Sequence, residues 1–265
     1  MRPRLATIVT GLVLLALYAP IVLVAANSLN ADDRLASWAG ATSRWWVEMA
    51  GDPRVRTDLG TSLLVGVGTT CLSVTLALLE ALWWRGASRR GRRLLEASTF
   101  ARIILPEVVL ALALFLAAQQ LGLPLGVGAI MVGQAVFCSA YATIVLQARL
   151  QTIGTSLEEA AADLGAPPHR VFGRVTLPLL ASAILAASLL VLSFSFDDVV
   201  VAQFLGGTQA ETLPVLLLGK IRLTVSPQVN AIGTALMLTT ALPVVAGLLL
   251  GRLPVPGSRP VGARR

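Results

Sequence analysis

The sequence has 265 residues, of which 55% are hydrophobic and only 13% are charged, and its mean hydropathy is +0.78. A soluble domain of this size carries about 25% charged residues, so the composition argues against a water-soluble protein and for one solvated by lipid. The net charge of +7 arises from 20 Arg and one Lys against 14 acidic residues, and its uneven distribution along the chain argues against nucleic-acid binding.

Six apolar segments are long enough to cross the hydrocarbon core of a bilayer, which takes about 20 residues in a helix. Each carries at most one acidic residue, and the alternation of apolar and polar residues that marks membrane strands is absent. The sequence therefore predicts an all-α polytopic membrane protein with six transmembrane helices. In chain order these cover Leu5–Ala26, Leu59–Trp84, Ile103–Leu121, residues 127–148, Val175–Phe196 and Asn230–Gly251.

Basic residues predict the orientation of these helices. With the N-terminus inside, 15 of the 21 basic residues lie on the cytoplasmic side, which is the side that Lys and Arg favour. The outer side holds the other six: Arg34, Arg44, Arg54, Arg56, Lys220 and Arg222. The distribution therefore predicts an N-in, C-in topology. The first apolar run, at 22 residues, exceeds the 7–15 residues of a signal-peptide core, so we interpret it as an uncleaved helix.

Two segments on the outer side are predicted to hold short helices. The stretch RWWVEM at residues 44–49 is expected to lie on the membrane face, because tryptophan favours the membrane–water interface. The apolar stretch Leu213–Gly219 is too short to span a bilayer, so we expect a surface or partly inserted helix there.

A polar segment, EEAAADLGAPPHRVFGRVTLPLL at residues 158–180, separates two apolar runs on the predicted cytoplasmic side. Ser156 and Glu159 match a capping box, with the serine as the N-cap of a helix. Apolar residues then recur at the spacing of one helical face: Leu157, Ala160, Ala161 and Leu164. Gly165 is placed to end this helix, and the two prolines that follow are placed to begin the next one. We therefore expect a helix of about eight residues, about 12 Å long, on a stiff elbow.

The physical chemistry of this short helix leaves two interpretations open. A face of small apolar residues on a stiff elbow suits docking into a groove of another protein. A loop helix that covers the end of its own bundle would show the same pattern, and the periodicity alone does not separate the two.

The segment resembles the EAA loop of ABC-type import permeases. The shared pattern is Glu159-Ala160-Ala161, a glycine four residues after the second alanine, and the ending Val175-Thr176-Leu177-Pro178. In that family the loop, here residues 156–178, is the coupling helix that docks on a cytoplasmic ATPase subunit. The resemblance implies that the following residues couple this chain to the ATPase: Glu159, Ala160, Ala161, Leu164, Gly165, Phe172 and Pro178.

Further segments extend the resemblance over residues 59–250. They include LPEVVLALAL, LSFSFDDVVVAQFLGG and TLPVLLLGKIR, and together they look like the second permease subunit of spermidine/putrescine importers. Glu80 and the stretch ASAI at 181–184 depart from the pattern of these relatives. The resemblance implies a type I ABC importer permease fold, with a first helix and outer segment (1–58), a permease domain (59–250) and a basic cytoplasmic tail (251–265).

The resemblance also implies partners and a location. The chain would act in a bacterial inner membrane with cytoplasmic ABC ATPase subunits, a second permease subunit and an extracytoplasmic substrate-binding protein. It would bind no cofactor itself, while the ATPase subunits would use ATP and magnesium. Gly219-Lys220 lacks the upstream glycine and the following Ser or Thr of a P-loop, so the chain is predicted to be a transport subunit and not an enzyme.

Acidic residues within or at the edge of a membrane span are costly, which makes them candidates for a substrate path. Asp197 and Asp198 end the fifth span close to Phe194, and two carboxylates beside an aromatic face could attract a flexible polyamine cation. A solvated acidic pair at a helix end is the alternative. The family resemblance, in which the acidic pair recurs, favours the substrate path.

Two further acidic residues lie in predicted spans. Glu107 follows Pro106 near the start of the third span, where it either joins the substrate path or only hydrogen-bonds its own helix. Glu80 lies near the inner end of the second span and is expected to pair with Arg85 or to extend toward the membrane surface.

A polyamine importer permease is therefore the expected function, and three alternatives remain. Related permeases carry other solutes such as ferric iron or aminophosphonates. An ion-coupled secondary carrier would show paired repeats with interrupted spans, which the sequence does not indicate. A membrane enzyme would need reactive groups, but the chain has one histidine and neither an HExxH nor a GxSxG motif.

Overall fold

The computed structural model describes residues 3–33, 35–224 and 226–251, and in this part of the chain the regular structure is helical. A single antiparallel bridge joins Asn30 and Ala41 in the outer segment. The helices in chain order are α1 (Pro3–Asn27), α2 (Arg44–Gly51), α3 (Pro53–Gly86), α4 (Arg89–Ile104), α5 (Glu107–Gln120), α6 (Val127–Ile153), α7 (Ser156–Asp163), α8 (Pro168–Val171), the π-helical turn η1 (Phe172–Thr176), α9 (Leu177–Asp197), α10 (Val200–Leu205), α11 (Leu213–Leu223) and α12 (Pro227–Gly251).

Within the described residues, five helical segments are long and apolar enough to cross a membrane. A sixth span is present if the bent pair of α4 and α5 is counted as one. The all-α fold with six transmembrane spans is confirmed in this form. The five unbroken spans are Thr7–Asn27, Pro53–Gly86, Val127–Ile153, Pro168–Asp197 and Pro227–Gly247.

The third span differs from the prediction of one helix over Ile103–Leu121. The chain instead forms α4, which includes the basic stretch expected as a loop, and then turns by 103° into α5. Pro106 lies at the turn, where it has no amide hydrogen to donate and restricts Leu105 to extended backbone (φ −61°, ψ 128°). The carbonyl of Pro106 accepts a hydrogen bond from the Val109 amide (2.9 Å) and so begins α5.

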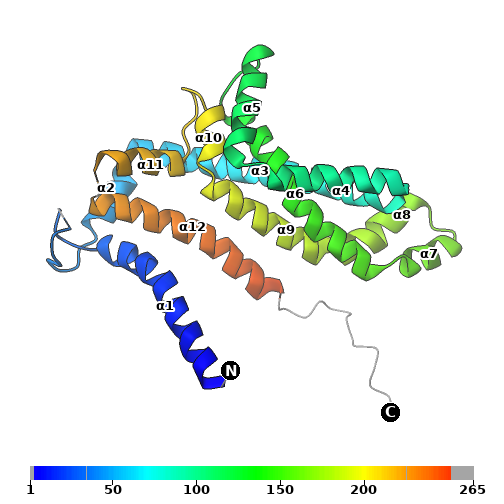
Figure 1. The fold of residues 1–265 in the computed structure, drawn as a ribbon, viewed down its shortest axis with the longest axis horizontal. Coiled ribbons are helices and arrows are strands. Elements are labelled where there is room, and N and C mark those ends of the chain that lie inside the picture. Colours follow the sequence, from blue (N-terminus) through cyan, green and yellow to red (C-terminus); the bar gives the residue numbers. More distant parts are fainter. Residues whose placement is uncertain (1–2, 34, 225, 252–265) are drawn as a thin grey trace.

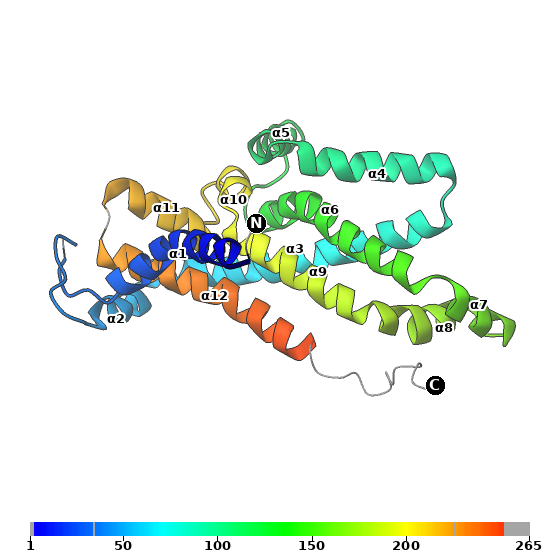
Figure 2. The same cartoon turned by 60° about the horizontal axis from the view of Figure 1, so that its bottom comes forward.

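The centre of the molecule consists of α3, α6 and α9, which lie side by side along the long axis (Figures 1 and 2). Small residues allow these helices to approach closely, as expected for helices that pack in lipid. Gly66 of α3 faces Phe196 of α9, and a Cβ atom on Gly66 would lie 2.8 Å from the ring. The buried residues shared by the three helices include Ala77, Ala81, Cys138, Ala142, Leu146, Leu180, Ala187 and Val191.

The two ends of the long axis hold different connections (Figures 1 and 2). One end carries α7 and α8, the end of α3 and the end of α6, while α2 and α11 lie at the opposite end. The connection between the second and third spans and the connection between the fourth and fifth spans, both predicted to be cytoplasmic, thus lie at the end that holds α7. Apart from this bundle, α1 packs on α12, and none of the residues of its apolar window is buried.

The end that holds α2 is closed by side chains of the outer segment. Trp45 is buried and donates from Nε1 to the Asn30 carbonyl (2.8 Å), so it packs within this segment rather than on the membrane face. Asp52 caps α3 and pairs with Lys220 of α11 at 3.3 Å. Burial opposes the ionisation of Asp52, but the Arg54 amide and the Lys220 ammonium outweigh it and hold the pKa of Asp52 below its ordinary value.

The second outer segment contains α11, which is the short helix expected there. Leu213 and Leu216 are buried against α3, α9 and α12, and the Leu213 amide donates to Ser62 Oγ of α3 (2.8 Å). This packing agrees with a partly inserted helix rather than one that lies free on the surface.

Candidate functional site

The segment 156–178 forms the short helix and elbow expected from its sequence. α7 has eight residues, and Gly165 ends it with a φ of +80°, a conformation that L side chains rarely adopt. Pro168 begins α8, and the chain then continues through η1 into α9 without a break. The predicted capping box is wrong in its register, because Thr155 is the N-cap and Ser156 is the first helical residue. No side chain hydrogen-bonds to the N-terminus of α7.

Glu158 fastens α7 to the rest of the molecule. Its Oε1 accepts hydrogen bonds from Arg85 Nη1 at the end of α3 (2.8 Å) and from Thr176 Oγ1 of η1 (2.6 Å). The Arg85 guanidinium also donates to the carbonyl of Gly154, just before α7. The side chains of Arg85 and Glu158 are only 18% and 21% exposed, so water screens this ion pair incompletely. One carboxylate therefore connects the ends of two membrane-spanning helices to the short helix between them.

The neighbouring Glu159 has different surroundings. Its side chain is exposed and makes no hydrogen bond or ion pair within the part of the chain that the structure describes. α7 has no buried residue, and two leucines of its predicted apolar face, Leu157 and Leu164, are 54% and 90% exposed. The apolar face of α7 is therefore exposed, while the contacts of Glu158 attach another side of the helix to the bundle.

The remaining predicted coupling residues lie around this helix. Ala160 is exposed and Ala161 is half-buried within α7, whereas Pro178 is exposed in the first turn of α9. Phe172 is half-buried and lines a cavity of 430 Å³ between α7 and the end of α3, together with Arg85 and Glu158. The structure therefore brings these residues to one end of the molecule, on two sides of α7.

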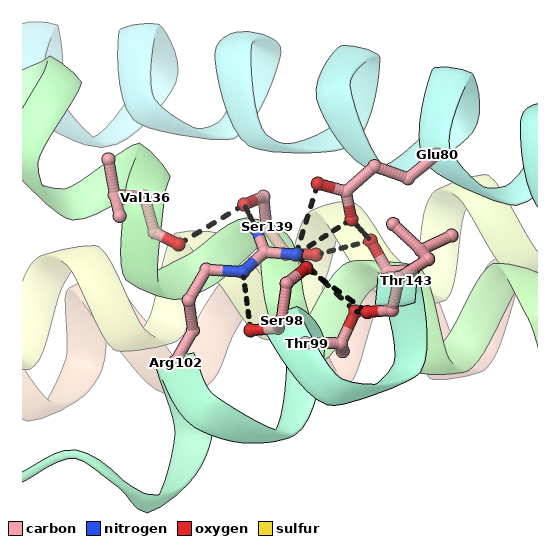
Figure 3. A network of polar contacts seen from close by, with 8 residues as sticks. Glu80, Ser98, Thr99, Arg102, Val136, Ser139 and Thr143 are labelled. Atoms are coloured by element: carbon pink, nitrogen blue, oxygen red, sulfur yellow. Dashed lines mark hydrogen bonds and ion pairs between the residues drawn. The ribbon is translucent and has the colours of Figure 1, made fainter. Parts of the chain in front are cut away.

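A second polar cluster joins α3, α4 and α6 inside the membrane-spanning region (Figure 3). Arg102 of α4 donates from Nη2 to both carboxylate oxygens of Glu80 (3.0 and 2.9 Å) and from Nη1 to Ser139 Oγ (2.7 Å). Thr143 donates to Glu80 Oε2 at 2.7 Å. The expectation that Glu80 pairs with Arg85 is wrong, because the bend after α4 allows this basic helix to lie along α3 and α6.

Removal of one charge from this cluster is expected to destabilise the protein more than removal of both. Arg102→Leu leaves a mostly buried carboxylate without its cation, which costs about 3–5 kcal/mol, whereas Glu80→Leu/Arg102→Leu removes the whole pair. We expect a clearly lower melting temperature for Arg102→Leu and a smaller decrease for the double variant in thermal unfolding of the purified complex. A double variant that loses as much as both single variants together would contradict the pairing.

A third polar cluster surrounds the end of α9. Asp198 accepts hydrogen bonds from Gln134 Nε2 of α6 (2.7 Å) and from the Val201 amide at the start of α10 (2.9 Å). Oε1 of Gln134 in turn accepts from Thr69 of α3 (3.0 Å) and Ser195 of α9 (2.6 Å). Asp198 is thus held at the meeting point of α6, α9 and α10 by a chain of polar groups.

The other residues predicted for the substrate path lie in different environments. Glu107, the first residue of α5, lies near enough to Asp198 for its negative charge to act on that carboxyl group. Phe194, one helical turn before Asp198, packs edge-on against Tyr141 with ring centroids 5.0 Å apart. Asp197 is exposed and makes no hydrogen bond or ion pair among the described residues. The two adjacent aspartates therefore occupy different environments, and Glu107 accompanies only Asp198.

Sequence reasoning missed several groups that complete these clusters. Gln134, Thr69 and Ser195 are uncharged and lie within apolar runs, so the search for charged residues in spans passed over them. A polar amide in the middle of a membrane helix is itself a signal, because such groups seek partners across helices. Arg85 and Glu158 are 73 residues apart, and no local pattern in the sequence indicates their contact.

Comparison with known proteins decides the family. Residues 70–255 match the family described as binding-protein-dependent transport system inner membrane component. The chain belongs to this family. It is therefore the permease component of an ABC importer in the inner membrane, and the resemblance found in its sequence is confirmed.

Individual relatives agree with this assignment. The chain is 33% identical to the putrescine transport system permease protein PotI of Escherichia coli (strain K12) over 228 residues, which cover 83% of this chain and 81% of that protein. It is 28% identical to the spermidine/putrescine transport system permease protein PotC of the same strain over 236 residues, or 89% of each chain. Among solved structures, a bacterial ABC transporter for the import of alginate superposes with a TM-score of 0.69 at 19% identity, covering 94% of this chain and 95% of that one. The type I permease fold is thereby confirmed.

Proposed function

We propose that this permease carries polyamines and is driven by ABC ATPase subunits that dock on α7. The chain would require a second permease subunit and an extracytoplasmic binding protein, as the name of its family indicates for the latter. It would bind no nucleotide itself, and the ATPase subunits would use ATP and magnesium. Residues 59–250 would form the permease domain, preceded by the first helix and outer segment.

The different surroundings of the two glutamates in α7 support its docking role. Glu158 attaches the helix to α3 and η1, while Glu159 and, on another side of the helix, Leu157 and Leu164 remain exposed. A helix that only covered the end of its own bundle would bury these apolar residues. The proposed contact surface therefore comprises Glu159, Ala160, Ala161, Leu164, Gly165, Phe172 and Pro178.

The observation that carries the polyamine assignment is the meeting of Asp198 and Glu107 within the helix bundle. Two carboxyl groups this close repel each other when both are ionised, and a cation between them relieves that repulsion. Phe194 lies one helical turn before Asp198, with Tyr141 packed edge-on against it, and these rings would offer aromatic surface to the same cation. These features suit a flexible chain with ammonium groups, which the relatives PotI and PotC carry according to their names.

Features of the structure also argue against two of the alternative functions. An aminophosphonate carries negative charge and would meet the two carboxyl groups unfavourably. An ion-coupled secondary carrier would not need a tethered docking helix with an exposed face. Ferric iron remains a competing cation, so it belongs among the substrates to be tested.

Uptake by the reconstituted importer tests the proposed function. We expect ATP-dependent accumulation of putrescine or spermidine in liposomes that contain the tagged chain, its ATPase, its partner permease and the binding protein. Asp198→Asn removes a charge at the meeting point and should reduce uptake at least about tenfold, whereas Asp197→Asn, at an exposed position, should cost less. Assembly with the ATPase should stay unchanged in both variants.

Three results would argue against the proposal. Accumulation of ferric iron or an aminophosphonate in place of polyamines would replace the substrate. Uptake driven by an ion gradient without ATP would overturn the mechanism. Full polyamine uptake by Asp197→Asn/Asp198→Asn would remove both aspartates from the path.

A further inference from the structure

A polar cavity of 580 Å³ lies between the start of α3, the end of α10 and the connection from α10 to α11. Its lining combines two carboxyl groups with side-chain amides and hydroxyl groups: Asp58, Glu211, Gln203, Gln209, Thr57 and Thr61. Neither carboxylate belongs to the clusters described above. The elements that carry these residues, α10 and the connection to α11, lie away from α7 (Figure 1).

Asp58 is an unusual residue in this lining. It is only 7% exposed, and its Oδ2 atom is buried without a hydrogen-bond partner among the described residues. A buried carboxylate that lacks a partner costs free energy, so such groups are rare unless a ligand completes them. Asp58 therefore places a desolvated carboxylate, one oxygen of which has no partner, in the lining of the cavity.

The neighbouring charges make this wall negative. Glu211, which also lines the cavity, and Asp52 both act on Asp58 with the same sign of charge. Arg54, one helical turn before Asp58, attracts it from a distance, but its side chain is exposed and forms no ion pair with Asp58 in the described part of the chain. The cavity thus combines net negative charge with an acceptor that no basic residue occupies.

We propose that this cavity binds an ammonium group of the transported amine before the amine reaches Asp198. An ammonium group donates three hydrogen bonds, and the lining supplies the Asp58 and Glu211 carboxylates together with amide and hydroxyl oxygens to accept them. α10 connects the two sites, because Asp198 accepts from its first turn and Gln203 of the same helix lines the cavity.

This inference rests on the proposed polyamine function, and one set of measurements separates the two. Asp58→Asn/Glu211→Gln removes both charges from the cavity with little change in shape. We expect putrescine uptake by the complete reconstituted importer to fall about tenfold or more at saturating binding protein. The melting temperature should stay the same or rise, because the unpartnered buried charge is gone.

The matched control is Asp33→Asn/Glu48→Gln, which removes the same two charges from exposed positions of the outer segment. It should retain uptake, because exposed ion pairs contribute little. If the wild-type importer takes up no amine, the proposed function fails and the site fails with it. If it takes up amines and Asp58→Asn/Glu211→Gln does so equally well, only the site is overturned. A loss of uptake that follows a loss of thermal stability would also overturn the site, since Asp58 would then be structural.

Discussion

Glu159→Arg is expected to abolish retention of the ATPase on the tagged permease and to reduce solute uptake by about one to two orders of magnitude. Glu159 is exposed in α7 and makes no hydrogen bond or ion pair among the described residues, so the change breaks no contact within the chain. A reversed charge within a docking surface costs several kcal/mol because like charges then face each other. Co-purification of the ATPase and uptake by the reconstituted importer measure the two effects.

Asp163→Arg provides the matched control, since Asp163 is an exposed acid at the other end of the same helix. It lies off the apolar face, and a basic residue near the C-terminus of a helix is slightly favourable. The control should therefore retain the ATPase. Glu159→Gln separates charge reversal from loss of the carboxylate and should give an intermediate effect. ATPase retention and full uptake by Glu159→Arg would contradict docking on this face of α7.

The helical fold was predictable because its signals are local. Long uncharged runs identify membrane spans, and Gly165 and the prolines after it fix the limits of α7 and α8. The bend at Pro106 was missed because apolar residues continue across it, so the hydropathy of the sequence indicates one span. α4 looked like a loop because of its arginines, yet Arg102 near its end pairs with the mostly buried Glu80, so the basic stretch forms a helix that packs against the bundle.

The sites were predictable only in part because their partners come from distant elements. Asp198 was identified as an intramembrane acid, but Gln134, which binds it, lies 64 residues away in an apolar run. Asp197 and Asp198 are chemically identical neighbours, and only the place where α9 ends leaves one exposed and the other half-buried. Asp58 gave no signal in the sequence, because it lies among the polar residues that precede a span, where an acid is ordinary.

Loss of the ion pair between Arg85 of α3 and Glu158 of α7 is expected to have a second large effect. Arg85→Gln and Glu158→Gln should each lower the number of solute molecules imported per ATP hydrolysed by about tenfold, while the ATPase stays bound. α7 has no buried residue, so the Arg85–Glu158 ion pair and the Thr176 hydrogen bond carry much of its attachment to the bundle. Without them, a movement of α7 imposed by the ATPase would no longer displace α3 and α9. Parallel measurements of uptake and ATP hydrolysis in liposomes give this ratio.

A double-variant cycle distinguishes this coupling role from general damage. Arg85→Gln/Glu158→Gln should be no worse than either single variant, because all three remove the same interaction. Arg85→Lys keeps the charge and should restore part of the ratio. The corresponding cycle on Arg44 and Glu48, an ion pair of the same 2.8 Å length with side chains 56% and 42% exposed, should change nothing. Additive losses at Arg85 and Glu158 would show that the two residues act separately. Release of the ATPase by Glu158→Gln would instead show that this glutamate belongs to the docking surface. The proposed role of the Arg85–Glu158 ion pair in transmitting movement from α7 to α3 would then be contradicted.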